Sequence, residues 1–357
     1  MGVFPSCPRA FFVKLVLQLV LPLLLAACSN KDDVFRQESF VFGTRVEISI
    51  QGEPTSKAEA AAAAVLQRFD ALHRKLHAWQ PSALERLNTA FASGTRAPVD
   101  SELAYILQDA RDYSLQNGEL FNPAIGNLIR LWGFQADQPQ SVLPDAKAIA
   151  AEVKAAPSMR NVHVENGIAW SDNPAVRIDL GGYAKGYALD EAANILKQRG
   201  VRNALINIGG NVMALGRHGD RPWKVGIQHP RKPGVVATLE LHDGEAIGTS
   251  GDYQRYFEAS GKRYCHLIDP RNGRPAEGMQ SVTILVSGSH AGTRSDVLSK
   301  PLFIGGANQL TAEAERSNLE NVLAIAADGS VLVTPAMQKR LQWSEPAQAF
   351  QLLKTVR

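Results

Sequence analysis

The chain is poor in cysteine. Its 357 residues contain three, Cys7, Cys28 and Cys265, and the first two lie in or border an N-terminal apolar segment. Cys265 therefore has no partner for a disulfide, even in an oxidising compartment. Because Cys265 stands in an apolar strand pattern, we expect it to be a small buried hydrophobic side chain rather than a reactive thiol.

The sequence also lacks the motifs of several common enzyme classes. HExxH, GxSxG and CxxC do not occur, which excludes the commonest zinc, serine-hydrolase and dithiol sites. No internal repeat or low-complexity linker is visible, and 38 Lys and Arg face 35 Asp and Glu. This near balance favours neither a nucleic-acid partner nor attraction to an anionic membrane.

A long apolar run occurs near the N-terminus. Arg9 and Lys14 precede Leu15–Leu25, which has the length of a signal-peptide core and is too short for a spanning helix of about 20 residues. The run ends in Leu-Ala-Ala-Cys, which resembles the lipobox of bacterial lipoproteins. We therefore predict that Cys28 carries a lipid anchor, with an uncleaved anchor as the alternative.

This N-terminus predicts the domain organisation and the location. Residues 1–27 are predicted to be a lipoprotein signal peptide, 28–37 a tether and 38–345 a single folded domain. The protein is expected on a bacterial cell membrane or outer membrane, lipid-anchored and facing the periplasm. Ser29 after the cysteine favours the outer membrane by resemblance to lipoprotein sorting signals.

Hydrophobic periodicity predicts an α+β fold with mixed or antiparallel sheets and helices packed around them, because helices and strands come partly in blocks. Helices are predicted from Ser56, where Glu59 completes a capping box, from Asp100 or Ser101, after Pro144, and around Lys185. Strands are predicted over 38–50, 176–180, 204–208, 223–228, 235–241, 253–259, 262–269, 281–287, 322–326 and 331–334.

The stretch from Arg177 to Asp190, RIDLGGYAKGYALD, has the parts of an anion site. A predicted strand enters Gly181–Gly182 and then a helix with Lys185, so backbone amides, a helix N-terminus and an ammonium could meet one anion. The spacing fits neither GxGxxG nor GxxxxGK[ST]. A tight turn with a solvated lysine is the alternative.

Two further residues are candidates for chemistry. His266 stands at a strand end beside the turn at 270–273, where a general base is usefully placed, although a hydrogen-bonded structural histidine is the alternative. Asp296 is the best isolated candidate for a ligand of a hard metal ion, and a helix N-cap is the alternative.

The order of several sequence blocks is more specific than any one of them. The blocks are Ser82-Ala-Leu-Glu-Arg-Leu-Asn, Phe121-Asn-Pro-Ala-Ile-Gly with Leu131-Trp-Gly-Phe, Asp179-Leu-Gly-Gly-Tyr-Ala-Lys-Gly, Asn207-Ile-Gly-Gly-Asn, Val225-Gly-Ile-Gln-His-Pro-Arg, Thr249-Ser-Gly-Asp-Tyr and His266-Leu-Ile-Asp-Pro-Arg-Asn-Gly. From about Phe42 to about Leu332 the chain resembles the ApbE family, the FAD:protein FMN transferases.

The resemblance implies a reaction and its residues. In this family a Ser or Thr hydroxyl of a partner protein attacks the FMN phosphorus of FAD, and AMP leaves. His266 and Asp296 match the catalytic positions, and Ala184, Asp296 and Lys300 match positions that hold Mg²⁺. The positions that match flavin-binding residues are Phe42, Trp79, Asn122, Pro123, Ala124, Gly181, Lys185, Tyr187 and Ile268.

The chain differs from the family pattern at three of these positions. Asn122 and Ala124 stand where the family usually has Asp and Thr, and Lys300 replaces the threonine that helps to bind metal. One hypothesis is that Lys300 weakens or replaces the metal. The alternative is that Lys300 turns to solvent while Mg²⁺ binds at Asp296 and the Ala184 carbonyl.

Three functions are therefore considered. The first is covalent transfer of FMN from FAD to a flavin-accepting redox protein, expected to be a subunit of a membrane electron-transfer complex. The second is hydrolysis of FAD to FMN and AMP. The third is a non-catalytic FAD-binding lipoprotein. No nucleic acid is expected as a partner.

Overall fold

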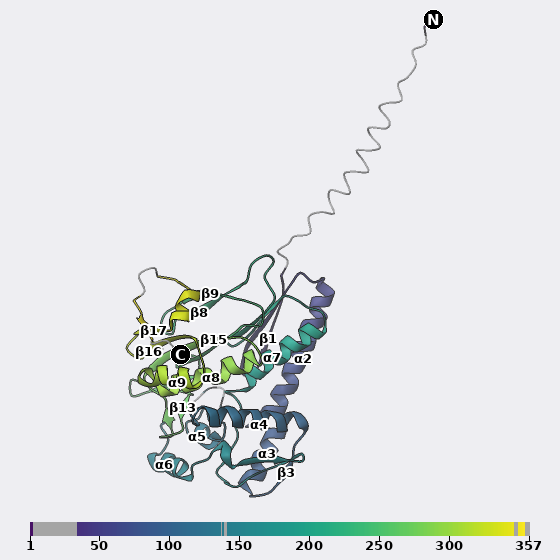
Figure 1. The fold of residues 1–357 in the computed structure, drawn as a ribbon. Helices are drawn as coiled ribbons and strands as arrows, with labels where there is room; N and C mark the ends of the chain where they lie inside the picture. Colours follow the sequence, from purple (N-terminus) through teal and green to yellow (C-terminus); the bar gives the residue numbers. More distant parts are fainter. Residues whose placement is uncertain (3–33, 137, 139–140, 346–348, 354–357) are drawn as a thin grey trace.

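A nine-stranded sheet organises the molecule, which we describe from a computed structural model over residues 1–2, 34–136, 138, 141–345 and 349–353 (Figure 1). Neighbouring strands run antiparallel, except for the parallel last pair. In spatial order the strands are β1 (Val34–Val41), β2 (Thr44–Gln51), β6 (Ala204–Ile208), β7 (Asn211–Leu215), β10 (Ala246–Gly251), β15 (Met279–Val286), β16 (Asn321–Ala326), β17 (Val331–Val333) and β19 (Gln351–Leu352).

Both faces of this sheet are covered, which explains why every residue of β15 is buried. One face shares the main hydrophobic cluster with helices α2 (Thr55–Leu76), α7 (Ala184–Gln198) and α8 (Ala291–Gly305). A second cluster joins the other face to α10 and a small sheet. These elements are α10 (Pro335–Arg340), β8 (Trp223–Gln228), β9 (Val235–Leu241) and β18 (Leu341–Trp343).

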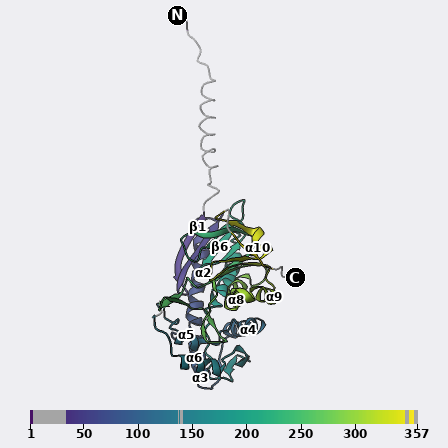
Figure 2. The same cartoon turned by 90° about the vertical axis from the view of Figure 1, so that its left-hand side faces the viewer.

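Among the remaining helices and short strands, α3, α5 and α6 lie at the end of the molecule away from β8 and β9, whereas α9 lies beside α8 (Figures 1 and 2). The helices are α3 (Ala83–Ala92), α4 (Ser101–Gln116), α5 (Gly126–Leu131), α6 (Ala146–Ala155) and α9 (Leu310–Arg316), with 3₁₀ turns at Met159–Asn161 and Ala307–Gln309. The strands are β3 (Ala97–Pro98), β4 (Val162–Glu165), β5 (Ile168–Ser171), β11 (Tyr256–Ala259), β12 (Lys262–Cys265), β13 (Ile268–Asp269) and β14 (Arg274–Pro275).

The α+β prediction is confirmed, and most predicted elements are present. Helices α4 and α6 begin at Ser101 and Ala146, close to the predicted starts, and the carboxylates of Asp100 and Asp145 cap them. The hairpin at Ser260–Gly261 and the pair β16–β17 also form. The folded region extends past both predicted domain limits, since β1 begins at Val34 and β19 follows residue 345.

Two local predictions were wrong, and one helix was not predicted. The segment 38–50 is not one strand but the hairpin of β1 and β2, which turns at Phe42 and Gly43 with positive φ at both residues. Helix α2 begins after Pro54 without a side-chain cap, so the Ser56 capping box does not form. Helix α3, which the sequence analysis missed, is capped by the Ser82 hydroxyl.

The prediction of a strand over 176–180 is also wrong. The backbone N–H and C=O groups of this segment form hydrogen bonds with a side chain and a loop instead of with neighbouring strands. The buried Asn88 amide donates to the Ile178 carbonyl at 2.9 Å, and its oxygen accepts from the Ile178 N–H at 2.7 Å. The Asp179 N–H donates to the carbonyl of Pro123. A side chain and a loop thus take the place of neighbouring strands, which leaves the following glycine turn at the edge of the core.

The described ranges do not include the predicted signal peptide or Cys28. Within these ranges, no helix has both the length and the apolar character that crossing a bilayer requires.

Candidate functional site

Asp296 lies inside helix α8, not at its start, so the N-cap alternative was wrong. Its side chain is 3% exposed. Oδ2 accepts a hydrogen bond from the Gly186 N–H at 3.0 Å, and Oδ1 lies 2.6 Å from Nζ of Lys300. Burial alone would raise the pKa of Asp296, but the charges of Lys185 and Lys300 and these hydrogen bonds lower it below its ordinary value.

Glycines allow the close approach that brings Asp296 to α7. A Cβ on Gly186 would lie 2.6 Å from the Gly292 carbonyl oxygen and 2.7 Å from Cβ of Asp296. On the other side of α8, a Cβ on Gly248 of β10 would meet the carbonyl oxygen of Ser295 at 2.1 Å. Helix α8 is therefore held between α7 and the sheet, and the Asp296 carboxylate has little freedom to move.

Helix α8 takes its N-terminal cap from α7. The Asp190 carboxylate accepts from the N–H groups of Gly292 and Thr293, both at 2.8 Å, and from the Thr293 hydroxyl at 2.7 Å. The local N-cap residue, His290, provides no side-chain bond. The sequence analysis missed Asp190 because its partners lie about a hundred positions away in the chain, where no local pattern can indicate them.

Two lysines converge on Asp296. Lys300 Nζ donates to the carboxylate and, at 2.6 Å, to the main-chain carbonyl of Asp296 itself. Lys185 Nζ lies 4.0 Å from Oδ2 and donates to the Gly181 carbonyl at 3.1 Å. The alternative in which Lys300 turns to solvent is wrong, because its side chain is 12% exposed. Burial lowers the pKa of Lys300, against the effect of the Asp296 charge.

The glycine turn before α7 is built around Asp179. Its Oδ1 accepts from the Gly181 N–H at 2.8 Å, and its Oδ2 accepts from the Trp79 indole at 2.9 Å. A Cβ on Gly182 would meet Cε of Lys300 at 2.7 Å. Trp79, the turn and Lys300 are therefore linked. Asp179 was not singled out, although an aspartate two residues before a turn glycine is a recognisable turn signal.

His266 faces the same positive charges. Its Nδ1 lies 3.1 Å from the Arg255 carbonyl oxygen, which can only accept, so Nδ1 carries the hydrogen and Nε2 has the free lone pair. Desolvation of the ring, followed by the positive charge of Lys185, lowers the pKa of His266 to about 3, and Lys300 acts in the same direction. The ring is therefore neutral near pH 7.

Hydrogen bonds within the protein hold the segment from Asn122 to Ala124 in place. The Asn122 amide donates to the Pro157 carbonyl at 3.0 Å, and its oxygen accepts from the Ala124 N–H at 3.0 Å. Pro123 and Ala124 are buried. Of the other expected flavin contacts, Phe42 packs against Phe69.

Two expected flavin contacts point toward other parts of the protein. Tyr187 stacks on Tyr183 and donates to Glu102 of α4. Ile268 is buried in the small hydrophobic cluster around α5. The structure therefore joins Trp79, Gly181, Lys185, Asp296 and Lys300 through hydrogen bonds and ion pairs, whereas Tyr187 and Ile268 contact other parts of the protein.

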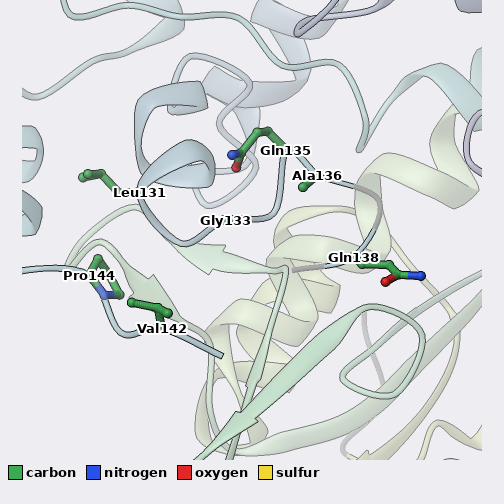
Figure 3. A pocket seen from close by; sticks show the side chains of 7 residues that line it. All are labelled: Leu131, Gly133, Gln135, Ala136, Gln138, Val142 and Pro144. Carbon is green, nitrogen blue, oxygen red and sulfur yellow. The ribbon is translucent and has the colours of Figure 1, made fainter. Parts of the chain in front are cut away.

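A cavity of about 320 Å³ lies beside the segment that follows α5 (Figure 3). The lining residues are Leu131, Gly133, Gln135, Ala136, Gln138, Val142 and Pro144. They include no charged or nucleophilic side chain, so the cavity by itself carries no chemistry. Phe134, between two lining residues in the chain, has its ring 6.4 Å from the imidazole of His266.

The expected magnesium ion does not fit the arrangement around Asp296. Mg²⁺ requires near-octahedral oxygen ligands at about 2.1 Å. Here Lys300 Nζ contacts both Oδ1 and the main-chain oxygen of Asp296, and Oδ2 is bonded to the Gly186 N–H. In the described part of the chain, no group of three or more His, Cys, Asp or Glu side chains gathers in a metal-binding arrangement.

Comparison with known proteins gives a consistent family assignment. The ApbE family profile matches residues 42–324. The FAD:protein FMN transferase of Rhodobacter capsulatus is 42% identical over 303 residues, 85% of this chain and 57% of that protein. The FAD:protein FMN transferase of Klebsiella pneumoniae is 35% identical over 253 residues, 68% of this chain and 71% of that protein.

Solved structures agree with the sequence relatives. The ApbE protein of Thermotoga maritima matches with a TM-score of 0.79 at 28% identity, over 86% of this chain and 99% of its own. The apo form of the Pseudomonas stutzeri flavinyl transferase ApbE matches with a TM-score of 0.75 at 28% identity, over 87% and 97%. The shared fold, the profile match and the identities lead to one conclusion: the chain belongs to the ApbE family.

Proposed function

We propose that this chain transfers FMN from FAD to a serine or threonine hydroxyl of a partner protein and releases AMP. The similar proteins support this reaction, because they are named FAD:protein FMN transferase and flavinyl transferase ApbE. The observation that carries the proposal is the cluster of Lys185, Lys300 and Asp296 beside the Gly181–Gly182 turn, with His266 close enough for the two lysines to lower its pKa. A pyrophosphate needs such a cradle, because charge moves to its bridging oxygen during transfer.

The chemistry can be assigned to atoms of this chain. The acceptor hydroxyl oxygen forms a bond to the phosphorus attached to riboflavin, and the bond from this phosphorus to the bridging oxygen breaks. The electron pair stays on AMP, and the hydroxyl proton passes to Nε2 of His266. The bound pyrophosphate offsets the charges of Lys185 and Lys300, which act after desolvation of the ring to lower the pKa of His266.

Asp296 and Asp179 act as positioning residues in this scheme. Asp296 holds the ammonium of Lys300, and Asp179 joins the glycine turn to the Trp79 indole. An indole at this place offers an apolar face to the rings of FAD. The guanidinium of Arg177 lies 4.6 Å from the centre of that indole, which keeps the ring in place from one side.

One experiment separates transfer from its two alternatives. The purified protein is incubated with FAD and a candidate acceptor, and AMP and in-gel flavin fluorescence are measured. AMP together with a fluorescent acceptor is the expected result. AMP without acceptor labelling would instead indicate FAD hydrolysis, and bound FAD without AMP would indicate a binding protein. FAD binding without AMP release is included as an outcome because Asn122 and Ala124 lack the carboxylate and the hydroxyl that the family usually has at these positions.

The expected setting of the reaction is the periplasmic side of a membrane, with Cys28 lipidated and a membrane redox subunit as the acceptor. The signal-like segment ending at Cys28 supports this setting. An acceptor in a membrane complex would meet a lipid-anchored enzyme without having to leave the membrane surface.

A further inference from the structure

The Asp296 cluster contains more positive than negative charge. Lys185 and Lys300 each form an ion pair with Asp296, at 4.0 and 2.6 Å. Among the residues that the structure describes, neither lysine has a second carboxylate within 4.0 Å. A half-buried cluster with one surplus positive charge is costly without a counterion, so it favours an anionic ligand.

Lys300 is also held in a fixed position. Its ammonium donates to the Oδ1 and main-chain oxygens of Asp296, both at 2.6 Å. Its stem lies where a Cβ on Gly182 would come within 2.7 Å of Cε and 3.1 Å of Cδ. An ammonium has three N–H donors, and two are used by Asp296. The third remains for a ligand at the glycine turn.

The place of this donor matters for the reaction. Lys300 meets the Gly181–Gly182 turn directly before α7, where the N-terminal backbone of the helix carries partial positive charge. Lys185 extends from the first turn of the same helix. An anion at this turn would therefore face a helix N-terminus and two ammonium groups, of which one is fixed by a buried carboxylate.

We propose that Lys300 provides the fixed positive charge at the FAD pyrophosphate, so that FMN transfer by this chain proceeds without a divalent metal ion. This inference rests on the proposed function. When the bond between the flavin-side phosphorus and the bridging oxygen breaks, the electron pair and the negative charge go to AMP. The Lys300 ammonium donates a hydrogen bond to the phosphate oxygens without losing its proton, so no co-reactant is needed.

The test compares the parent with Lys300→Thr, in EDTA and in Mg²⁺. FAD affinity is measured by fluorescence titration, and AMP release is measured with FAD and acceptor. For the parent, both quantities should agree within twofold between the two conditions. For Lys300→Thr, EDTA should weaken FAD binding at least tenfold, and Mg²⁺ should restore it, because the change removes the cation and frees Asp296.

Two further variants distinguish an effect of Lys300 itself from a general loss of positive charge or a failure to fold. Lys197→Thr removes an exposed charge near the end of α7 and should behave as the parent. Lys300→Met keeps most of the stem and serves if the threonine variant does not fold, which circular dichroism will show. It should likewise weaken FAD binding in EDTA.

Two results would overturn different claims. If EDTA abolishes AMP release by the parent and Mg²⁺ restores it, the inference on Lys300 is wrong while the proposed function stands. If the parent releases no AMP in either condition, the proposed function fails. The FAD titrations then still decide whether Lys300 replaces a metal ion in FAD binding. If the affinity of the parent protein for FAD depends on Mg²⁺, the inference is wrong.

Discussion

His266 and Cys265 are neighbours in the chain, and burial acts on each through its own chemistry. Burial raises the pKa of the Cys265 thiol to about 12, so it remains uncharged and unreactive near pH 7. Its 2% exposure confirms the prediction of a small buried side chain. For His266, the same desolvation lowers the pKa to about 3, which leaves a neutral ring with a free Nε2.

His266 should make stability depend on pH in the acidic range. An unfolded histidine titrates near pH 6.5, whereas the folded ring titrates near 3. Between these values the unfolded state takes up a proton that the folded state does not, so stability is lost as pH falls from about 6.5 toward 3 and is unaffected above. We expect the parent to lose up to about 1.4 kcal/mol per pH unit relative to His266→Gln.

Urea titrations of both proteins at several pH values between 7 and 4 measure this difference. The carboxylates that titrate in both proteins cancel in the comparison. A constant difference across the range would mean that the folded ring titrates normally. Far-UV circular dichroism at pH 7 establishes that the variant is folded before the comparison begins.

At the scale of elements, the contact between α7 and α8 decides the position of the site. Gly186 and Gly292 allow the two helices to approach, and Asp190 of α7 caps α8. The Asp296 carboxylate in turn accepts from the Gly186 N–H. The glycine turn, its lysine and the buried carboxylate are thus held by one packed helix pair.

Gly186→Ala should destabilise the protein, although alanine is the better helix former. In a helix with no close neighbour, replacing glycine with alanine would stabilise the protein by up to about 1 kcal/mol. Here the new Cβ would lie 2.6 Å from a backbone oxygen, which cannot yield like a flexible side chain. We expect a net loss of about 1 to 3 kcal/mol and weaker FAD binding, measured by urea unfolding and fluorescence titration.

Asn194→Ala on the exposed face of α7 is the matched control, with an expected effect within about 0.5 kcal/mol. Should Gly186→Ala instead be as stable as the parent and bind FAD equally well, the helix contact is not as close as described. The same two measurements therefore test both the packing and its link to the site.

At the scale of the whole molecule, both faces of the large sheet are covered, which accounts for the burial of every residue of β15, polar ones included. The described fold begins at Val34. A lipid on Cys28 would leave six residues before it, and a fully extended chain spans at most about 3.6 Å per residue. The folded body would then lie within about 20 Å of the membrane.

Cys28→Ser should release the protein from the membrane fraction or stop its processing. Without the thiol, neither lipid attachment nor the associated cleavage can follow, so the variant should differ from the parent in fractionation, electrophoretic mobility or both. Cys7→Ser is the control, since Cys7 lies within the segment expected to be removed. The lipoprotein prediction is wrong if Cys28→Ser remains as processed and as membrane-bound as the parent.

Local patterns were informative where short-range forces decide the structure. Asp100 and Asp145 cap helices that start at the next residue, and Ser260–Gly261 closes a hairpin, because the bonded groups lie a few positions apart. The order of the sequence blocks was sufficient for the family, and the hydrophobic periodicity was sufficient for the α+β class. The prediction of a strand over 176–180 failed, because Asn88, far away in the chain, satisfies its backbone.

The sequence by itself determined the family and the elements with local signals, and it predicted Lys185, His266, Asp296 and Lys300 as site residues. Only the tertiary structure decided that Asp296 and Lys300 form a buried ion pair with each other. Spacing of four residues places them on one helix face, but it leaves open whether the lysine turns to solvent. The contact of α8 with the glycine turn buries Lys300. Burial makes an unpaired ammonium costly, so it pairs with Asp296 where the metal was expected.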